Sequence, residues 1–323
     1  MRKLLFLLIF LCDPAWAIGN IVDTAFVEQA IARGVIVWDV RASADYQRGH
    51  LPGAVNIGAV AQALRNPNTE DFLSTAQVEK ALGSAGIDPA QEIVVYATRG
   101  EANAYMAAYA LRYFGGRVAH VYHDGIDGWR AAGRDISTGA ARRESVALKL
   151  TPDTTLGIAT KDMLAAQKRA GVQIIDARTV GEFSGNDIRA IRGGHIPGAI
   201  NIPYENNWVD PDAAFKLARK QVADNRGMSL KPAAQLQALY SNLDPNKETI
   251  VYCQSGARAS ETAGVLEQLG FKNVKIYDSS WLGYGNTLDA PAENVTFFNV
   301  GLLNSKLSAL QSRITQLEKE LAD

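Results

Sequence analysis

Cysteine is nearly absent from this sequence, which contains only Cys12 and Cys253 in 323 residues. Two thiols are too few for a disulfide-stapled scaffold or for a zinc site made of cysteines. Neither sign of charge is in excess, with 33 Lys and Arg against 34 Asp and Glu, so a nucleic-acid partner is not expected. The histidines are also few, and they have no spacing typical of metal ligands: His50, His120, His123 and His195. No metal site is therefore predicted.

The N-terminal apolar run, Leu4–Leu11, is shorter than the helix of about 20 residues that crosses a bilayer. Two basic residues precede it, and small residues follow it as far as Ala17. This order predicts a secretory signal peptide over residues 1–17, cleaved after Ala17. Two alternatives are a retained N-terminal anchor and a lipoprotein signal centred on Cys12, and the bulky residue before that cysteine disfavours the second. We expect a periplasmic or secreted protein that has no membrane contact after cleavage.

Cleavage would leave Cys253 as the only thiol of an exported protein. In an oxidising compartment a free thiol is a liability. Such a cysteine is either buried and inert or retained for its chemistry.

Two stretches of the chain repeat each other. Residues 36–57 and 174–202 both read as an apolar strand, Asp-x-Arg, an acid followed by an aromatic, and then Gly-His-Leu/Ile-Pro-Gly-Ala-Val/Ile-Asn-Ile. Residues 93–116 and 249–271 form a second matching pair. Strands separated by helical stretches predict α/β domains, each with a parallel sheet flanked by helices.

The length fits two domains, since a domain usually holds about 100–200 residues. Residues around 136–155 have no counterpart in the repeat. We therefore expect the following order: a first domain over 18–137, a linker over 138–155, a second domain over 156–291 and a C-terminal helix over 292–323.

These matched segments resemble the rhodanese (sulfurtransferase) family in its tandem two-domain form. The most specific pieces are Gly-His-Ile-Pro-Gly-Ala at 194–199, the strand–Cys–loop–helix at 250–268 and Tyr-Asp-Ser-Ser-Trp at 277–281. The last looks like the aspartate-rich tryptophan segment that closes the second domain of thiosulfate and mercaptopyruvate sulfurtransferases. The resemblance extends to about residue 291 and implies two tandem rhodanese-like domains.

The loop at 253–258 must turn from a buried strand into a helix within a few residues, and Gly256 can take the positive φ that such a turn requires. Its backbone N–H groups and the helix N-terminus would then hold an anion beside Cys253 and favour its thiolate. Arg258 adds a positive charge, the alternative being an ordinary surface charge of the helix. The loop residues expected to bind substrate are Gln254, Ser255, Gly256 and Ala257.

The spacing of Cys253 and Arg258 separates two chemistries. Four residues lie between them, one fewer than in cysteine-dependent phosphatases. A shorter loop makes a smaller pocket, which suits one sulfur atom better than a tetrahedral phosphate.

The resemblance implies that Cys253 and Arg258 are catalytic. Cys253 takes the outer sulfur of an anionic donor such as thiosulfate, becomes a persulfide, and passes the sulfur to a thiol or cyanide acceptor without any cofactor. Arg178 matches an arginine that binds the donor in this family. Because Arg41 repeats it in the half that has no nucleophile, a structural salt bridge is the alternative. Glu182 stands near the position where mercaptopyruvate members usually carry a second arginine, which favours thiosulfate. Thiosulfate members often have two basic residues just after the cysteine, where Gln254 and Ser255 are neutral, so mercaptopyruvate stays the alternative.

The first half lacks the reactive groups, because Ala97 and Ala102 align with the nucleophile and the arginine. We expect a non-catalytic rhodanese domain that packs against the catalytic one. His50 and His195 occupy equivalent positions in both halves, and a structural role is therefore expected for them.

The C-terminal segment carries a strict heptad pattern, with apolar residues in alternating steps of three and four. They are Val300, Leu303, Leu307, Leu310, Ile314, Leu317 and Leu321. A homodimer through residues 300–321 is predicted, and a helix packed on its own domain is the alternative.

Two other functions compete with sulfur transfer to small acceptors. One is a persulfide carrier or protein-binding module with little turnover, and the other is a coiled-coil scaffold with inert domains. The presence of Cys253, Gly256 and Arg258 argues against the scaffold.

Overall fold

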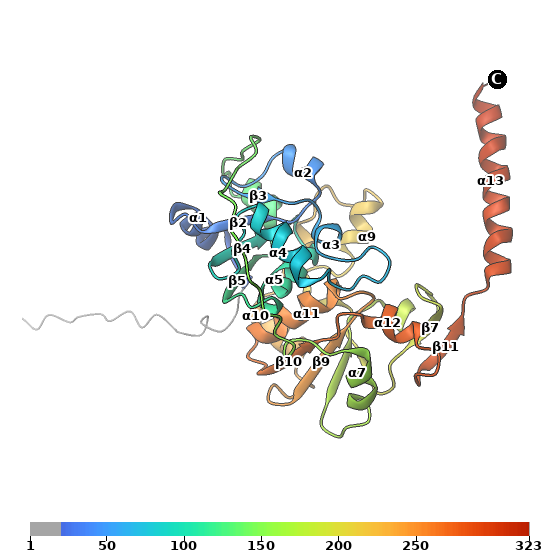
Figure 1. Ribbon diagram of the computed structural model, residues 1–323. Coiled ribbons are helices and arrows are strands. Elements are labelled where there is room, and N and C mark those ends of the chain that lie inside the picture. The colour runs from blue at the N-terminus through green and yellow to red at the C-terminus, as the bar shows by residue number, and fades with distance from the viewer. Residues whose placement is uncertain (1–20, 323) are drawn as a thin grey trace, which may run out of the picture.

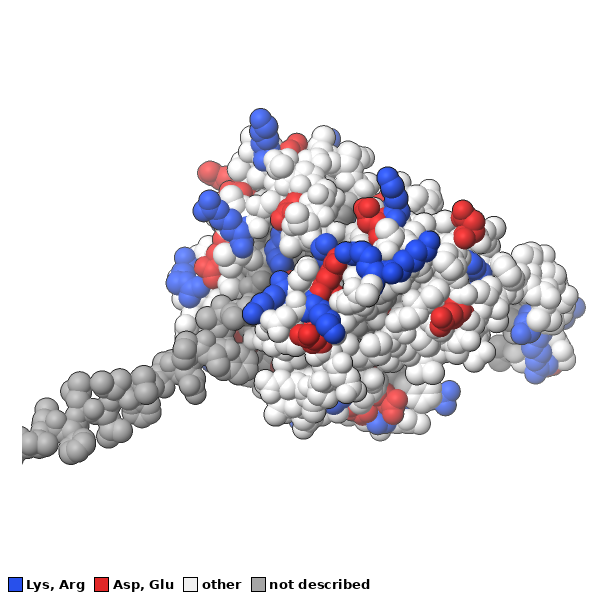
Figure 2. All heavy atoms as spheres, turned by 90° about the horizontal axis from the view of Figure 1, so that it is seen from below, with Lys and Arg blue, Asp and Glu red and all other residues white. Residues whose placement is uncertain are grey.

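The computed structural model describes residues 21–322, so the signal peptide predicted for residues 1–17 lies outside the described residues. Two α/β units follow each other along the chain, and the C-terminal helix stands away from both (Figure 1). Within residues 21–322, no helix is both long and apolar enough to cross a membrane. Basic and acidic side chains intermingle over the face drawn in Figure 2, as the balanced charge count leads one to expect.

The first unit is built on a parallel sheet of five strands in the order β1-β5-β4-β2-β3. The strands are β1 (Ile21–Val22), β2 (Ile36–Asp39), β3 (Val55–Asn56), β4 (Glu92–Tyr96) and β5 (Val118–Tyr122). The helices are α1 (Thr24–Ala32), α2 (Ser43–Gln47), α3 (Val60–Ala63), α4 (Thr75–Ser84), α5 (Asn103–Tyr113) and α6 (Gly125–Ala131).

Alternation along the strands gives this sheet a hydrophobic core on each face. Trp38 and Val95 pack with α3, α4 and α5 on one face, while Val37 and Val94 pack with α1, α2 and α6 on the other. Strands buried on both faces read as continuous apolar runs, which is why β2 and β4 could be recognised in the sequence.

The second unit repeats this plan with a parallel sheet in the order β10-β9-β6-β8. Its strands are β6 (Gln173–Asp176), β8 (Ile200–Asn201), β9 (Glu248–Tyr252) and β10 (Asn273–Ile276), and β7 (Arg192–His195) pairs separately with β11 (Glu293–Phe297). The α-helices are α7 (Thr160–Ala166), α8 (Val180–Phe183), α9 (Ala213–Ala218), α10 (Ala233–Leu239), α11 (Ala257–Gln268) and α12 (Ser280–Asn286). Two short 3₁₀ helices, η2 (Tyr204–Asn207) and η3 (Arg226–Met228), lie between β8 and α10.

The segment between the two units lies along the first one. The Val146 amide donates to the Gly83 carbonyl at 2.9 Å, and Leu148 and Leu150 pack against the core beneath α4 and α5. The connection therefore adds apolar contacts to the first unit.

The C-terminal segment, expected to be helical over 292–323, contains both a strand and a helix. Residues 293–297 form β11, which is antiparallel to β7, and α13 begins only at Val300 (Val300–Ala322). β-branched and aromatic residues favour the strand, and the Asn299 side chain caps the helix by accepting from the Leu302 amide at 2.9 Å.

All seven apolar heptad residues of α13 are exposed, from 36% at Leu303 to 87% at Leu321. The helix stands free of the two units (Figure 1). The alternative in which it packs on its own domain is therefore not what the structure shows.

Candidate active site

Cys253 follows β9 directly and lies at the base of the loop that leads into α11. The Gly256 N–H donates to its Sγ at 3.2 Å, and the Cys253 N–H donates to Ser280 Oγ at 3.0 Å. The cysteine is only 1% exposed. The loop thus places one backbone donor, the Gly256 N–H, on the sulfur at the N-terminus of α11, where a negative charge is stabilised.

Gly256 has the predicted left-handed backbone, with φ of +96°. A Cβ added there would lie 2.6 Å from Asp278 Oδ1. Only glycine fits this position without strain, and it aims the N–H at the sulfur.

The other loop residues have different environments. Gln254 Nε2 donates to the Arg189 carbonyl at 2.7 Å, the Ser255 carbonyl accepts from Arg65, and Ala257 packs against the core of the first unit. Gly256 is therefore the one of the four expected binding residues whose amide contacts Sγ directly.

Arg258 forms a two-pronged ion pair with Glu182 on α8, with N–O distances of 2.7 and 2.8 Å. Burial alone would raise the pKa of Glu182, but the hydrogen bonds and charge of Arg258 outweigh it and lower that pKa to about 2. The pair also raises the pKa of Arg258 despite its burial. The sequence identified both residues but not their pairing.

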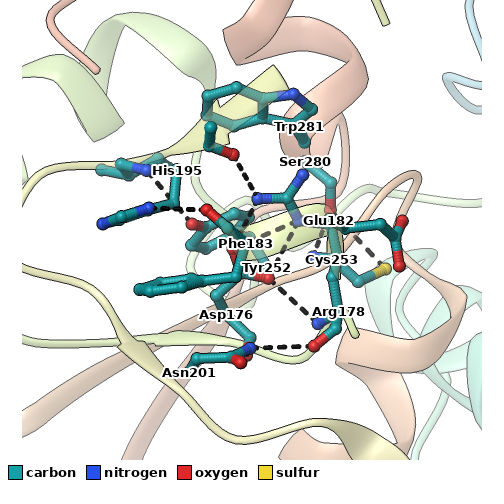
Figure 3. A network of polar contacts seen from close by, with 12 residues as sticks. Asp176, Arg178, Glu182, Phe183, His195, Asn201, Tyr252, Cys253, Ser280 and Trp281 are labelled. Atoms are coloured by element: carbon teal, nitrogen blue, oxygen red, sulfur yellow. Dashed lines mark hydrogen bonds and ion pairs between the residues drawn. The ribbon is translucent and has the colours of Figure 1, made fainter. Parts of the chain in front are cut away.

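Arg178 lies in a buried network of polar contacts at the end of β6. Its side chain is 1% exposed, its Nε and Nη2 donate to Asp176 at 2.9 and 2.6 Å, and Nη2 also donates to the Gly194 carbonyl. Its guanidinium lies 4.6 Å from the centre of the Trp281 ring. Figure 3 shows this network.

Arg41 in the first unit makes the same contacts with Asp39 and the Gly49 carbonyl. Since the arrangement occurs in both halves, with or without a nucleophile, it favours the alternative of a structural ion pair, which ties the end of β6 to β7. Donor binding by Arg178 stays a prediction.

The two equivalent histidines also serve the framework. His195 stacks on Phe183 with ring centres 3.6 Å apart and bonds its carbonyl through Nδ1. His50 stacks on Tyr46 at 3.8 Å and bonds its carbonyl in the same way. In both halves the histidine fixes the short helix that follows the Asp-x-Arg strand, in agreement with the structural role expected for it.

In the first unit, Ala97 follows β4 just as Cys253 follows β9. The loop after Ala97 is filled by the second unit: a Cβ on Gly100 would lie 2.7 Å from the side chain of Met228. The Met228 carbonyl bonds His123 Nε2 at 2.8 Å, and Arg99 reaches Asn225 at 3.3 Å. A loop without a nucleophile has thus become a contact surface between the units.

The reverse contact brings the first unit to the catalytic loop. Arg65 donates through Nη1 to the Ser255 carbonyl at 2.6 Å and through Nη2 to Asp278 Oδ2 at 3.2 Å. Burial raises the pKa of Asp278 to about 6, and the charge of Arg65 limits the rise.

Sequence reasoning missed Arg65, Asp278 and Ser280 as site residues. The last two lie inside the motif at 277–281, which was a usable signal. Arg65 lies in a segment without a counterpart in the repeat, so nothing local marked it. Among the residues that the structure describes, no group of three or more His, Cys, Asp or Glu side chains could hold a metal ion.

A family model described as the rhodanese-like domain matches residues 23–132 and 159–287. The thiosulfate sulfurtransferase of Corynebacterium glutamicum is 32% identical over 260 residues, which cover 77% of this chain and 81% of that protein. A putative thiosulfate sulfurtransferase of Mycobacterium leprae is 35% identical over 268 residues, covering 77% and 87%. One from Saccharopolyspora erythraea is 31% identical over 291 residues, covering 85% and 96%.

Among solved structures, wild-type EanB superposes with a TM-score of 0.72 at 20% identity. The alignment covers 85% of this chain and 69% of that one. At this level of identity the likeness concerns the fold.

Proposed function

Because this chain belongs to the rhodanese family and is a sulfurtransferase, we propose that it takes a sulfane sulfur from thiosulfate on Cys253 and delivers it to cyanide or a thiol. The observation that carries this proposal is a hydrogen bond from the Gly256 N–H to Cys253 Sγ, with 3.2 Å between nitrogen and sulfur. The bond lies in the loop that leads into a helix. Such a donor stabilises a thiolate and, after transfer, the charged outer part of a persulfide.

The first half-reaction forms a bond between Cys253 Sγ and the outer sulfur of thiosulfate. The sulfur–sulfur bond of the donor breaks, and its electron pair leaves with sulfite. In the second, the acceptor attacks the outer sulfur of the persulfide, and the electron pair of that bond returns to Sγ as thiolate. Atoms and electrons balance without a redox partner.

Glu182 supports thiosulfate as the donor. It stands near the position where mercaptopyruvate members usually carry a second arginine, so the carboxylate of mercaptopyruvate would lack that partner. The thiosulfate sulfurtransferases among the relatives also point to thiosulfate.

Mass spectrometry and thiocyanate formation test the proposal together. Thiosulfate should add the mass of one sulfur atom to the peptide that contains Cys253, and cyanide should remove it as thiocyanate. Cys253→Ser should fold normally and give neither signal. A persulfide that forms but does not turn over with cyanide would favour the carrier function, and a wild-type protein that never gains sulfur would refute the mechanism.

We also propose that the protein is exported. The support is the basic, apolar and small-residue order of residues 2–17. N-terminal sequencing of the mature protein should begin at Ile18, and an intact N-terminus in a secretion-competent host would contradict this.

We further propose that α13 pairs with α13 of a second copy. Its seven apolar residues form one exposed stripe. All d positions of the heptad are Leu, and the a positions include β-branched Val300 and Ile314, a combination that favours a parallel two-stranded coiled coil. In that register Arg313 at g would meet Glu318 at e of the other chain, with opposite charge.

Light scattering tests this pairing. Full-length protein should be a dimer, and truncation after Phe298 should give an active monomer, since that cut keeps β11 in place. Leu310→Lys should act like the truncation, whereas Ser308→Lys, on the polar side of the helix, should stay dimeric. A monomeric full-length protein would refute the proposal.

A further inference from the structure

We propose that Arg65, which belongs to the non-catalytic domain, is a positioning residue that holds the sulfur-binding loop of the catalytic domain in its working geometry. This inference rests on the proposed chemistry at Cys253. It assigns to the first domain a part in the reaction that the loss of its own nucleophile would not suggest.

Arg65 is held firmly before it reaches the loop. It follows α3 in a narrow turn, closed by backbone bonds from Asn66 N to Asp71 O at 2.8 Å and from Leu73 N to Leu64 O at 2.9 Å. The guanidinium lies 5.5 Å from the centre of the Phe72 ring. With 3% of its side chain exposed, Arg65 has few other positions available.

Arg65 acts on the loop through a single peptide unit, the one that joins Ser255 to Gly256. Arg65 Nη1 donates to the Ser255 carbonyl at 2.6 Å, and the next N–H in the chain, that of Gly256, donates to Cys253 Sγ at 3.2 Å. In a trans peptide the C=O and the following N–H point in opposite directions. Anchoring the oxygen on one side therefore aims the N–H at the sulfur on the other.

The positive charge also polarises this peptide. A charged donor on the carbonyl oxygen strengthens the N–H of the same unit as a donor, because neighbouring hydrogen bonds in a buried chain reinforce one another. Arg65 thus favours the thiolate at a distance, without touching the sulfur.

Asp278 completes the anchor. Its Oδ2 accepts from Arg65 Nη2 at 3.2 Å, so the buried guanidinium has a counter-ion from the catalytic domain. Two residues further on, Ser280 Oγ accepts the Cys253 N–H. The loop is therefore fixed both by the segment at 278–280 and by the other domain.

The interface supplies a matched control. Arg112 on α5 forms a two-pronged ion pair with Glu267 on α11, at 2.7 and 3.1 Å, across the same pair of domains. Both of these hydrogen bonds lie outside the loop at 253–258. Removing Arg112 should loosen the interface without redirecting the peptide beside Cys253.

The experiment compares Arg65→Met, Arg65→Lys and Arg112→Met with the wild type. Three quantities are measured: the melting temperature, kcat and KM for thiosulfate, and the pH profile of Cys253 alkylation by iodoacetamide. Arg65→Met should be alkylated several-fold more slowly than the wild type at neutral pH, because the Gly256 N–H is no longer aimed at the sulfur. It should lower kcat more than it changes KM, and Arg65→Lys should restore part of both.

Arg112→Met should lower the melting temperature but keep the wild-type alkylation profile. If Arg65→Met behaves in the same way, Arg65 is an interface residue only and the inference is wrong. If Arg65→Met does not fold, Arg65→Gln takes its place, and an alkylation profile of Arg65→Gln identical to that of the wild type would overturn the inference. The alkylation reading does not need sulfur transfer, so a failure of the proposed function would be seen separately, as a wild-type protein that never gains sulfur.

Discussion

Replacing Glu182 by Gln would separate the charge of this side chain from its other roles. Glu182 also closes a capping box at the start of α8, where its carboxylate accepts from the Thr179 N–H at 3.1 Å. Gln can make the same contact. The substitution should therefore leave the helix capped while depriving the partly buried Arg258 of its counter-ion.

The size of the effect follows from the pKa of Glu182, which is lowered from 4.5 to about 2. A shift of that size corresponds to about 3 kcal/mol at neutral pH. Breaking a buried pair from one side costs about 3–5 kcal/mol, in agreement with this figure. We expect Glu182→Gln to lose about 3 kcal/mol of stability at pH 7.

The pH dependence gives the sharper test. Because the folded-state pKa of Glu182 is depressed, the stability that it contributes is present above its unfolded pKa and is lost as the pH falls through about 2. The difference between wild type and variant in urea unfolding should shrink from about 3 kcal/mol at pH 7 to about 1 kcal/mol at pH 3. A difference that stays constant between pH 7 and pH 3, or no difference at all, would refute the ion-pair reasoning.

Three further substitutions test the site. Arg178→Met should cost about 3–5 kcal/mol in urea unfolding because it leaves Asp176 buried without its partner; a stable variant that only raises KM for thiosulfate would contradict the structural role. Gly256→Ala should abolish thiocyanate formation, since its Cβ would meet Asp278 at 2.6 Å in a left-handed backbone; wild-type activity would show that the loop is not held there. Asp278→Asn should remove a pH dependence of the stability. Because the pKa of Asp278 is raised to about 6, the wild type should lose about 3 kcal/mol of unfolding free energy relative to the variant as the pH rises from about 4 through 6. A pH-independent difference in unfolding would count against the raised pKa of Asp278.

The parts of this protein that could be predicted from the sequence are those that local patterns determine. The strand before Cys253 and the helix after it are marked by apolar and helix-forming runs, and Gly256 marks the turn between them. The alternation of strands and helical stretches predicted the parallel sheets, and the repeat predicted that the same fold occurs twice. Export and dimerisation stay predictions.

What could not be predicted are contacts between distant residues. The sequence also does not show which way a side chain turns, so it leaves open whether Arg178 binds the donor or pairs with Asp176, two residues away. Arg41, which repeats the pattern where no nucleophile exists, favours the ion pair. Arg65 lies 190 residues from Ser255, and no periodicity links them.

Two equivalent loops, one after β4 and one after β9, are each completed by contacts from the other domain. Arg65 reaches the loop after β9, and Met228 fills the loop after β4. If either half were removed, the other would therefore have unpaired polar groups and exposed apolar surface. The folded chain should behave as one cooperative unit that melts in a single transition, and neither half is expected to survive alone. On this reasoning the first domain, which lacks the nucleophile, is needed for the catalytic half to fold to completion.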